Sequence, residues 1–262
     1  MKKIPNFSRG MGIGGWLTNY KRFNVLRPEW RMAITQGDIE HFETYITEKD
    51  IAYIAQMGFD HVRLGFDQIV LEESPYCYRE LTLSIVEKFV SWCKKYSFTP
   101  VINMHKAIGN YCDIVEEVTL FDSEELQDRF VALWLELERR FALDNTVMFE
   151  LLNEVRDIDP EKWNDLAERT IKALRKINPV RKIIVGSTDW NHYEKLDKLR
   201  LYDDENIIYT FHIYHPHEFT HQKGVLQESE LYYNRSLCYP CDDVDRYRDF
   251  YLQSQFAGRC NR

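Results

Sequence analysis

Six short apolar runs alternate with amphipathic stretches along this chain, and the alternation constrains the fold more than any other feature. The runs have the length and residue types of buried strands, whereas the stretches between them carry apolar residues at helical spacing. Strands that alternate with helices predict a parallel sheet with helical crossovers, which is an α/β fold. No interior linker is rich in Gly, Ser or Pro, so we predict one domain over residues 1–262. The predicted strands cover residues 10–17, 59–64, 98–104, 146–152, 182–186 and 207–211.

Capping signals mark where several of the helices should begin. Thr47 and Asp50 form a capping pattern ahead of a helix that Gly58 should close. An acidic cap before Pro160 is typical of a helix start, and the helix should run to about residue 177. The other predicted helices cover residues 80–96, 122–141 and 242–253, with a short helical connection at 191–199.

Composition and charge exclude several classes of protein. The formal net charge is −8 with a pI of about 5.6, which argues against a general nucleic-acid binder and against attraction to anionic membranes. No apolar run is long enough to span a bilayer. Residues 1–7 contain two lysines but no apolar core, so we predict no signal peptide and a cytoplasmic location by default. A mature secreted form is the alternative.

Neither a cofactor nor a metal is expected. The glycines of residues 10–15 lie before and within a strand, whereas a dinucleotide loop lies between strand and helix. Four of the eight histidines fall in residues 211–221, but no HExxH-like pair supports a metal site. The CxxC pair Cys238 and Cys241 has no second pair at similar spacing. We therefore interpret all six cysteines as reduced thiols: Cys77, Cys93, Cys112, Cys238, Cys241 and Cys260.

Polar side chains recur where the predicted strands end. The carboxyl ends of parallel strands lie on one rim of a sheet, which is where ligands bind. Each residue also has a purely structural explanation. For example, Arg63 could be an ion-pair partner, and His105 could be a buried histidine whose hydrogen bonds are all made within the protein. Agreement among five strand ends favours a site. The residues are Arg63, His105, Asn153, Glu154, Asp189, Trp190, His212 and Tyr214.

Glu154 is the strongest candidate for chemistry. Partial burial at a barrel mouth favours the neutral form of a carboxyl group, and a neutral carboxylic acid can protonate a leaving-group oxygen. The neighbouring amide of Asn153 could hold a substrate hydroxyl. The alternative is a carboxylate that interacts with a helix dipole, but the next helix should start only near Pro160.

The aromatic residues divide into two groups. Trp16 and Trp190 lie near predicted strand ends, where flat rings can stack on sugars. The remaining tryptophans fall in helical or loop stretches and should pack against other elements: Trp30, Trp92, Trp134 and Trp163.

These motifs together resemble glycoside hydrolase family 5, the cellulase family A group of clan A barrels. The run from Val147 to Arg156 is similar to the family signature, with Asn-Glu at the end of the fourth strand. Residues 14–17, 51–63, 103–106 and 212–214 also resemble family segments. The resemblance implies a (β/α)8 TIM barrel and retaining endo-hydrolysis of β-1,4-glucan or a related β-linked polysaccharide. It implies that Glu154 is the acid/base and that Arg63, His105, Asn153, His212 and Tyr214 surround the reacting sugar.

The chain departs from the family in one important respect. The family nucleophile is a glutamate that ends the seventh barrel strand, and we find neither a seventh nor an eighth strand in the sequence. About six βα units are therefore expected, in a barrel truncated at its C-terminus and impaired in hydrolysis. The alternatives are a non-catalytic carbohydrate-binding remnant and a non-functional gene fragment. The expected partner is a β-linked oligo- or polysaccharide, with no nucleic acid and no membrane.

Overall fold

The computed structural model describes residues 4, 6–18, 34–111, 117–214 and 217–221, and the chain divides into two compact units. One unit runs from Ile4 to Phe211 and contains the sheet. The other takes in the chain from His212 onward together with Met1–Lys3, and its described part includes the short helix α9 (His217–Thr220). The prediction of one domain over residues 1–262 stays a prediction.

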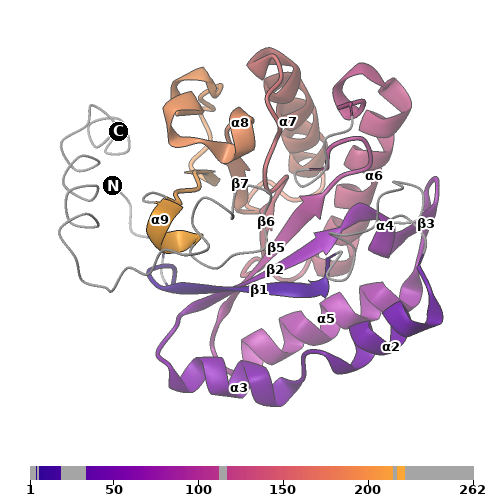
Figure 1. Cartoon of the computed structure of the whole chain (residues 1–262), viewed down its shortest axis with the longest axis vertical. Helices are drawn as coiled ribbons and strands as arrows, with labels where there is room; N and C mark the ends of the chain where they lie inside the picture. The colour runs from indigo at the N-terminus through magenta and orange to yellow at the C-terminus, as the bar shows by residue number, and fades with distance from the viewer. Residues whose placement is uncertain (1–3, 5, 19–33, 112–116, 215–216, 222–262) are drawn as a thin grey trace. The chain divides into compact units, whose positions relative to one another are not determined.

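The predicted parallel sheet is present. Six strands lie side by side in the order of the sequence, and every neighbouring pair is parallel. This topology confirms the α/β prediction, since each crossover returns the chain to the next position in the sheet (Figure 1). The strands are β1 (Gly10–Leu17), β2 (His61–Asp67), β5 (Thr99–Lys106), β6 (Met148–Glu150), β7 (Ile183–Gly186) and β8 (Ile207–Thr210).

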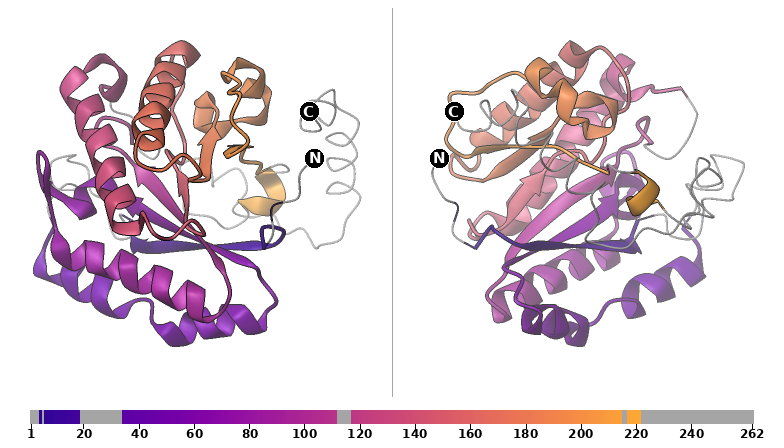
Figure 2. Two further views of the ribbon diagram at one scale, coloured as in Figure 1. Left: turned by 180° about the vertical axis from the view of Figure 1, so that it is seen from behind. Right: turned by 60° about the vertical axis from the view of Figure 1, so that its left-hand side comes forward.

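Helices cover one side of this sheet, and α6 and α7 lie side by side in every view (Figures 1 and 2). Capping starts them where expected: Thr47 and Asp50 form a capping box, and Asp159 accepts from the Glu161 N–H. The longer helices are α2 (Gln36–Thr44), α3 (Glu48–Gln56), α5 (Glu80–Lys95), α6 (Glu124–Phe141) and α7 (Pro160–Arg175). Short helices are α4 (Gln68–Leu71), α8 (Thr188–Asn191), η1 (Leu120–Asp122) and η2 (Tyr193–Lys198).

Several elements were not predicted, among them α2 and a small hairpin. Helix α2 begins at a capping box between Thr35 and Asp38, but few apolar residues mark its buried face. The hairpin is antiparallel and joins β3 (Glu72–Ser74) to β4 (Cys77–Tyr78), and strands this short carry no clear period in the sequence. The predicted helix at 242–253 lies outside the described residues.

The apolar core lies between the sheet and the helices, and it includes Trp134 and Trp163 as predicted. The opposite side of the sheet carries a smaller apolar cluster of Val101, Met148 and Ile184. Strand alternation then places Glu150, two residues after Met148, on this second side. The second side of the sheet is thus apolar near the start of β6 and polar toward its end.

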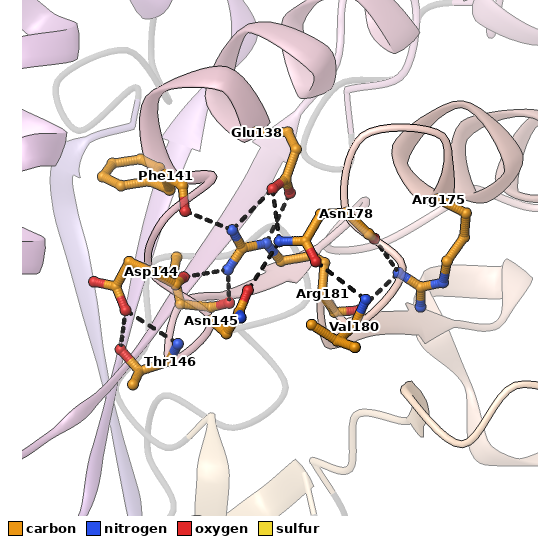
Figure 3. Close-up of polar contacts among 10 residues, drawn as sticks. Glu138, Phe141, Asp144, Asn145, Thr146, Arg175, Asn178, Val180 and Arg181 are labelled. Atoms are coloured by element: carbon orange, nitrogen blue, oxygen red, sulfur yellow. Dashed lines mark hydrogen bonds and ion pairs between the residues drawn. The ribbon is translucent and has the colours of Figure 1, made fainter.

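A buried ion pair ties α6 to the chain before β6 and β7. Arg181 and Glu138 are both fully buried, and the guanidinium donates Nε–H and Nη2–H to the two carboxylate oxygens at 2.7 and 3.0 Å. Figure 3 shows the other donors of the guanidinium pointing at backbone carbonyl groups. The acceptors are the carbonyl oxygens of Asp144 and Val147, each at 2.6 Å, and of Phe141 at 2.8 Å.

A second group of polar contacts holds the chain before β1 against the start of β2. The Asp60 carboxylate accepts from the backbone N–H groups of Ser8 and Arg9, and it lies 2.7 Å from His61 Nδ1. Burial raises the pKa of Asp60, but the hydrogen bonds from His61, Arg9 and Ser8 outweigh it and lower the pKa to about 2. The Asp60 carboxylate therefore stays charged through most of the acid range.

The two cysteines within the described residues have free thiols. Cys93 is buried in α5, where burial raises the pKa of its thiol, and Cys77 is exposed. Cys112, Cys238, Cys241 and Cys260 lie outside the described residues. No helix in the described part of the chain has the length and apolar character that a membrane crossing needs.

Candidate active site

Arg63 links β2 to the end of β6. Its guanidinium donates Nε–H and Nη2–H to the two oxygens of Glu150, at 2.6 and 2.8 Å, and Nη2–H also to Asn153 Oδ1 at 2.6 Å. Strand β2 continues to Asp67, beyond the predicted end at residue 64, so Arg63 lies inside the strand. Its long side chain nevertheless reaches the rim. Because Arg63 occupies the amide oxygen of Asn153, the NH2 group is the part of that amide suited to donate to a substrate hydroxyl.

Glu150 is the residue that the sequence interpretation missed. Its side chain is buried and takes the fork-shaped pair of bonds that best matches guanidinium to carboxylate. One signal could have found it: Glu150 is the only charged residue within the apolar run 147–152. A charge at such a position is rarely buried without a partner of opposite sign. The pair compensates the charge of Arg63 and fixes the orientation of its guanidinium.

His105 lies near the end of β5, next in the sheet to β6. Its Nδ1 is 3.3 Å from Oδ1 of the fully buried Asn103. Gly65 on β2 makes room for the imidazole, because a Cβ there would lie 3.3 Å from His105 Nδ1. The structure thus places His105 and Arg63 on neighbouring strands.

Asn153 and Glu154 lie three and four residues after the end of β6 at Glu150. The backbone N–H of Asn153 donates to the carbonyl oxygen of Met104 on β5 at 2.9 Å, which holds the start of the loop against the sheet. Asn153 is buried and Glu154 is partly exposed. Arg63 and Asn153 are therefore in contact, and Glu154 is the next residue. The roles assigned to these residues stay predictions.

The prediction for Trp16 is wrong, because its ring has no face available to a sugar. The side chain is 1% exposed, and its Nε1–H donates to the carbonyl oxygen of Phe42 at 2.8 Å. The ring stacks on Trp92 and meets the edge of Phe89. Trp16 therefore points to the helices α2 and α5. Proximity to a strand end does not specify the face of the sheet on which a side chain lies.

Trp190 lies after the C-terminal end of β7 and is 42% exposed. A sugar-stacking role for it stays a prediction. His212 and Tyr214 belong to the second unit, so their part in this site also stays a prediction. Within the described residues, no group of three or more His, Cys, Asp or Glu side chains could hold a metal ion.

Sequence comparison identifies relatives over most of the chain. The family model of cellulase (glycosyl hydrolase family 5) matches residues 23–252. Endoglucanase C of Acetivibrio thermocellus is 39% identical over 240 residues, which cover 90% of this chain and 66% of the relative. Cellodextrinase A of Ruminococcus flavefaciens is 35% identical over 227 residues, covering 85% of this chain and 62% of the relative. The chain thus spans slightly less than two thirds of the length of these curated relatives.

Structural comparison gives the same family. Endoglucanase Cel5A from Thermotoga maritima superposes with a TM-score of 0.75 and 28% identity, over 98% of this chain and 77% of that structure. The family's structures are (β/α)8 barrels, and the described six-stranded parallel sheet with its helices corresponds to part of one, which confirms the predicted fold class. The match of the family model to residues 23–252, together with this shared fold, shows that the chain belongs to glycosyl hydrolase family 5.

Proposed function

We propose that this chain acts on β-1,4-glucan or a related β-linked polysaccharide by retaining endo-hydrolysis, with Glu154 as the acid/base. One observation carries the proposal: the Arg63–Glu150 pair holds Asn153 beside a partly exposed Glu154 at the carboxyl end of β6. Carboxyl ends of barrel strands are where such enzymes place their catalytic groups.

Each residue has a separate task in this proposal. Glu154 protonates the oxygen of the leaving sugar and later takes a proton from water. Asn153 donates its amide N–H to the sugar 2-hydroxyl, a bond that strengthens in the transition state. Arg63 holds the amide oxygen of Asn153, so that the NH2 group cannot rotate away without breaking a charge-assisted hydrogen bond.

A retaining mechanism also needs a nucleophilic carboxylate about 5–5.5 Å from the acid/base. We assign no nucleophile within this chain. We expect a glutamate that ends a seventh sheet strand, after β8, to supply it. A chain without such a glutamate would lose the covalent step and hydrolyse glycosides several orders of magnitude more slowly than a chain that has one.

The relatives guide the choice of substrate. The names endoglucanase C and cellodextrinase A point to β-1,4-glucan and its oligosaccharides. Cel5A from Thermotoga maritima has been solved in complex with cellobiose and with mannotriose. We therefore propose a β-glucan as the first substrate and a β-mannan as the second.

The experiment is hydrolysis of an aryl β-cellobioside and of a soluble β-glucan. It compares the 262-residue chain with the same chain extended by two C-terminal βα units of a related barrel. Glu154→Gln should abolish turnover of the extended chain, whereas Glu136→Gln, a partly buried carboxylate paired with Arg140 on α6, should not. Retained activity in Glu154→Gln would contradict the acid/base assignment. Strong turnover by the unextended chain would show that a local carboxylate acts as nucleophile.

Binding without hydrolysis is the second candidate. It is favoured by the exposure of Trp190 after β7, since an exposed indole ring can stack on a sugar ring. Calorimetry with cellopentaose would measure this binding directly. Tight binding by a chain whose extended form still lacks turnover would select a carbohydrate-binding protein over an enzyme.

A further inference from the structure

The loop that carries Glu154 has no regular structure of its own. Between the end of β6 at Glu150 and the start of α7 at Pro160, residues 151–159 form neither helix nor strand. Backbone N–H and C=O groups in such a segment must find partners elsewhere when they are shielded from water. Leu151 and Asn153 donate to the strands β7 and β5 themselves, whereas the partners of residues 154–156 come from the loops after these two strands.

On the β5 side, Asn110 brackets Val155, the residue after Glu154. Its Nδ2–H donates to the carbonyl oxygen of Glu154 at 3.2 Å, and its Oδ1 accepts from the backbone N–H of Arg156 at 3.3 Å. Asn110 is fully buried. Its backbone N–H closes a tight turn by donating to the carbonyl oxygen of Ala107 at 3.0 Å. One side-chain amide thus holds the peptide groups on both sides of Val155.

That turn is built to present Asn110. Gly109 has a φ of +84°, a conformation that residues with a side chain rarely adopt. A Cβ at Gly109 would also lie 2.7 Å from the backbone nitrogen of Leu120. The carbonyl oxygen of Gly109 accepts from the N–H groups of Thr119 and Leu120, at 3.0 and 3.2 Å. The hydrogen bonds from Thr119 and Leu120, which lead into α6, therefore fix the turn that carries Asn110.

On the β7 side, three consecutive residues adopt a left-handed backbone. Asp189, Trp190 and Asn191 have φ values of 58°, 56° and 59°. Such conformations cost free energy in residues other than glycine, and they persist only where surrounding contacts require them. Here the Trp190 N–H donates to the carbonyl oxygen of Val155 at 2.8 Å. The Asp189 N–H makes a longer bond of 3.4 Å to the carbonyl oxygen of Arg156.

Asn191 completes this second support. It is fully buried, and its Oδ1 accepts from the Ser187 N–H at 2.9 Å. Its Nδ2 lies 3.5 Å from the carbonyl oxygen of Asn153. The side chain occupies space that only a glycine at 186 leaves open, since a Cβ there would lie 2.4 Å from Asn191 Nδ2. The left-handed turn and the small residue before it are thus parts of one arrangement.

We propose that Asn110 is a positioning residue for Glu154, with the left-handed turn 189–191 as the support on the other side. Together they hold the backbone of Asn153–Arg156 and so fix the direction in which the Glu154 carboxyl group points. This inference rests on the proposed function, in which Glu154 is the acid/base. It goes beyond that function by assigning a role to Asn110, which touches neither the substrate nor the reacting atoms.

The chain contains a matched control. Asn164 on α7 is also buried, and its amide brackets a different backbone segment in the same way. Its Nδ2–H donates to the carbonyl oxygen of Lys198 at 2.9 Å, and its Oδ1 accepts from the N–H of Arg200 at 3.0 Å. Asn110→Ala and Asn164→Ala each remove a pair of bonds to the backbone. Asn164→Ala also removes a bond from Nδ2 to the Glu161 carboxylate at 3.0 Å, so it should lower the midpoint of urea unfolding at least as much as Asn110→Ala does. Only the first should disturb the loop that carries Glu154.

Hydrogen exchange tests whether Asn110 holds the backbone of residues 154–156, and the measurement does not require an active enzyme. In the 262-residue chain, Asn110→Ala should accelerate exchange of the Arg156 amide hydrogen about tenfold or more, because its acceptor is gone. Asn164→Ala should leave that rate unchanged. Asn110→Asp keeps the acceptor and loses the donor, so it should preserve most of the protection at Arg156. Unchanged exchange in Asn110→Ala would overturn the proposal whatever the activity of the chain.

Leaving-group dependence tests the effect on Glu154. Phenyl β-cellobioside needs a proton on its leaving oxygen, whereas 2,4-dinitrophenyl β-cellobioside departs without one. Asn110→Ala should lower kcat/KM for the phenyl substrate by about 10²-fold, the loss expected from a displacement of roughly 1 Å, because kcat/KM reports only the steps up to departure of the aryl group. The dinitrophenyl substrate should lose much less.

The outcomes separate the two proposals. The aryl substrates are tested on the extended chain. If that chain, with Asn110 intact, cleaves neither of them, the proposed hydrolysis fails, and hydrogen exchange alone decides whether Asn110 holds the loop. If the chain is active and Asn110→Ala slows both substrates equally, or no more than Asn164→Ala does, Asn110 is a structural residue and the positioning role is refuted.

Discussion

Removing Arg181 should destabilise the protein more than removing any surface cation. Arg181→Met keeps an apolar side chain of similar length but leaves the carboxylate of Glu138 buried and without its counter-ion. Breaking one side of a buried pair costs about 3–5 kcal/mol. The carbonyl oxygens of Phe141, Asp144 and Val147 lose their donor as well, although Asn178 still donates to Glu138 at 2.9 Å. The expected loss is a large share of the roughly 5–15 kcal/mol that stabilises a typical domain.

Urea unfolding followed by circular dichroism measures this loss, with Arg169→Met as the control. Arg169 pairs with Asp128 at the surface, so its replacement should cost at most about 1 kcal/mol. The double variant Arg181→Met with Glu138→Leu should recover part of the lost stability, because no unpaired charge remains buried. A loss below about 1 kcal/mol for Arg181→Met, or a double variant no better than additive, would refute the argument.

Three further predictions concern other parts of the sheet. Because its pKa is lowered to about 2, the Asp60 carboxylate contributes stability above its unfolded pKa of about 3.9 and loses that contribution as pH falls toward 2. The difference in urea midpoint between the unaltered chain and Asp60→Asn should therefore be full at pH 7 and shrink between pH 4 and 2. An equal difference at both extremes would contradict this. Trp16→Phe should lower the thermal midpoint without weakening cellopentaose binding, and Trp190→Ala should do the reverse; the opposite pattern would restore Trp16 as a sugar platform. Gly186→Ala should displace Asn191 and accelerate amide exchange in residues 151–159, whereas unchanged exchange would show that Asn191 does not support the loop.

The sequence alone was sufficient for the fold class and for the identity of the strands. Each strand of the six-stranded sheet is a local apolar run, and several helices begin at a local cap such as Asp159 before Pro160, so neighbouring residues carry the information. The parallel order follows from the alternation of strands and helices. The Asn153–Glu154 pair could be found in the same way, because it stands directly after the apolar run 147–152.

Only the tertiary structure decided which side chains meet. Arg63 and Glu150 are 87 positions apart, and nothing near either residue in the sequence specifies the other. The face on which Trp16 lies depends on the packing of α2 and α5. Likewise, the contact of Asn110 with the backbone of Glu154 spans 44 positions and exists because β5 and β6 are neighbours in the sheet. Local patterns specify elements, whereas the contacts that orient Glu154 arise between loops that only the folded sheet brings together.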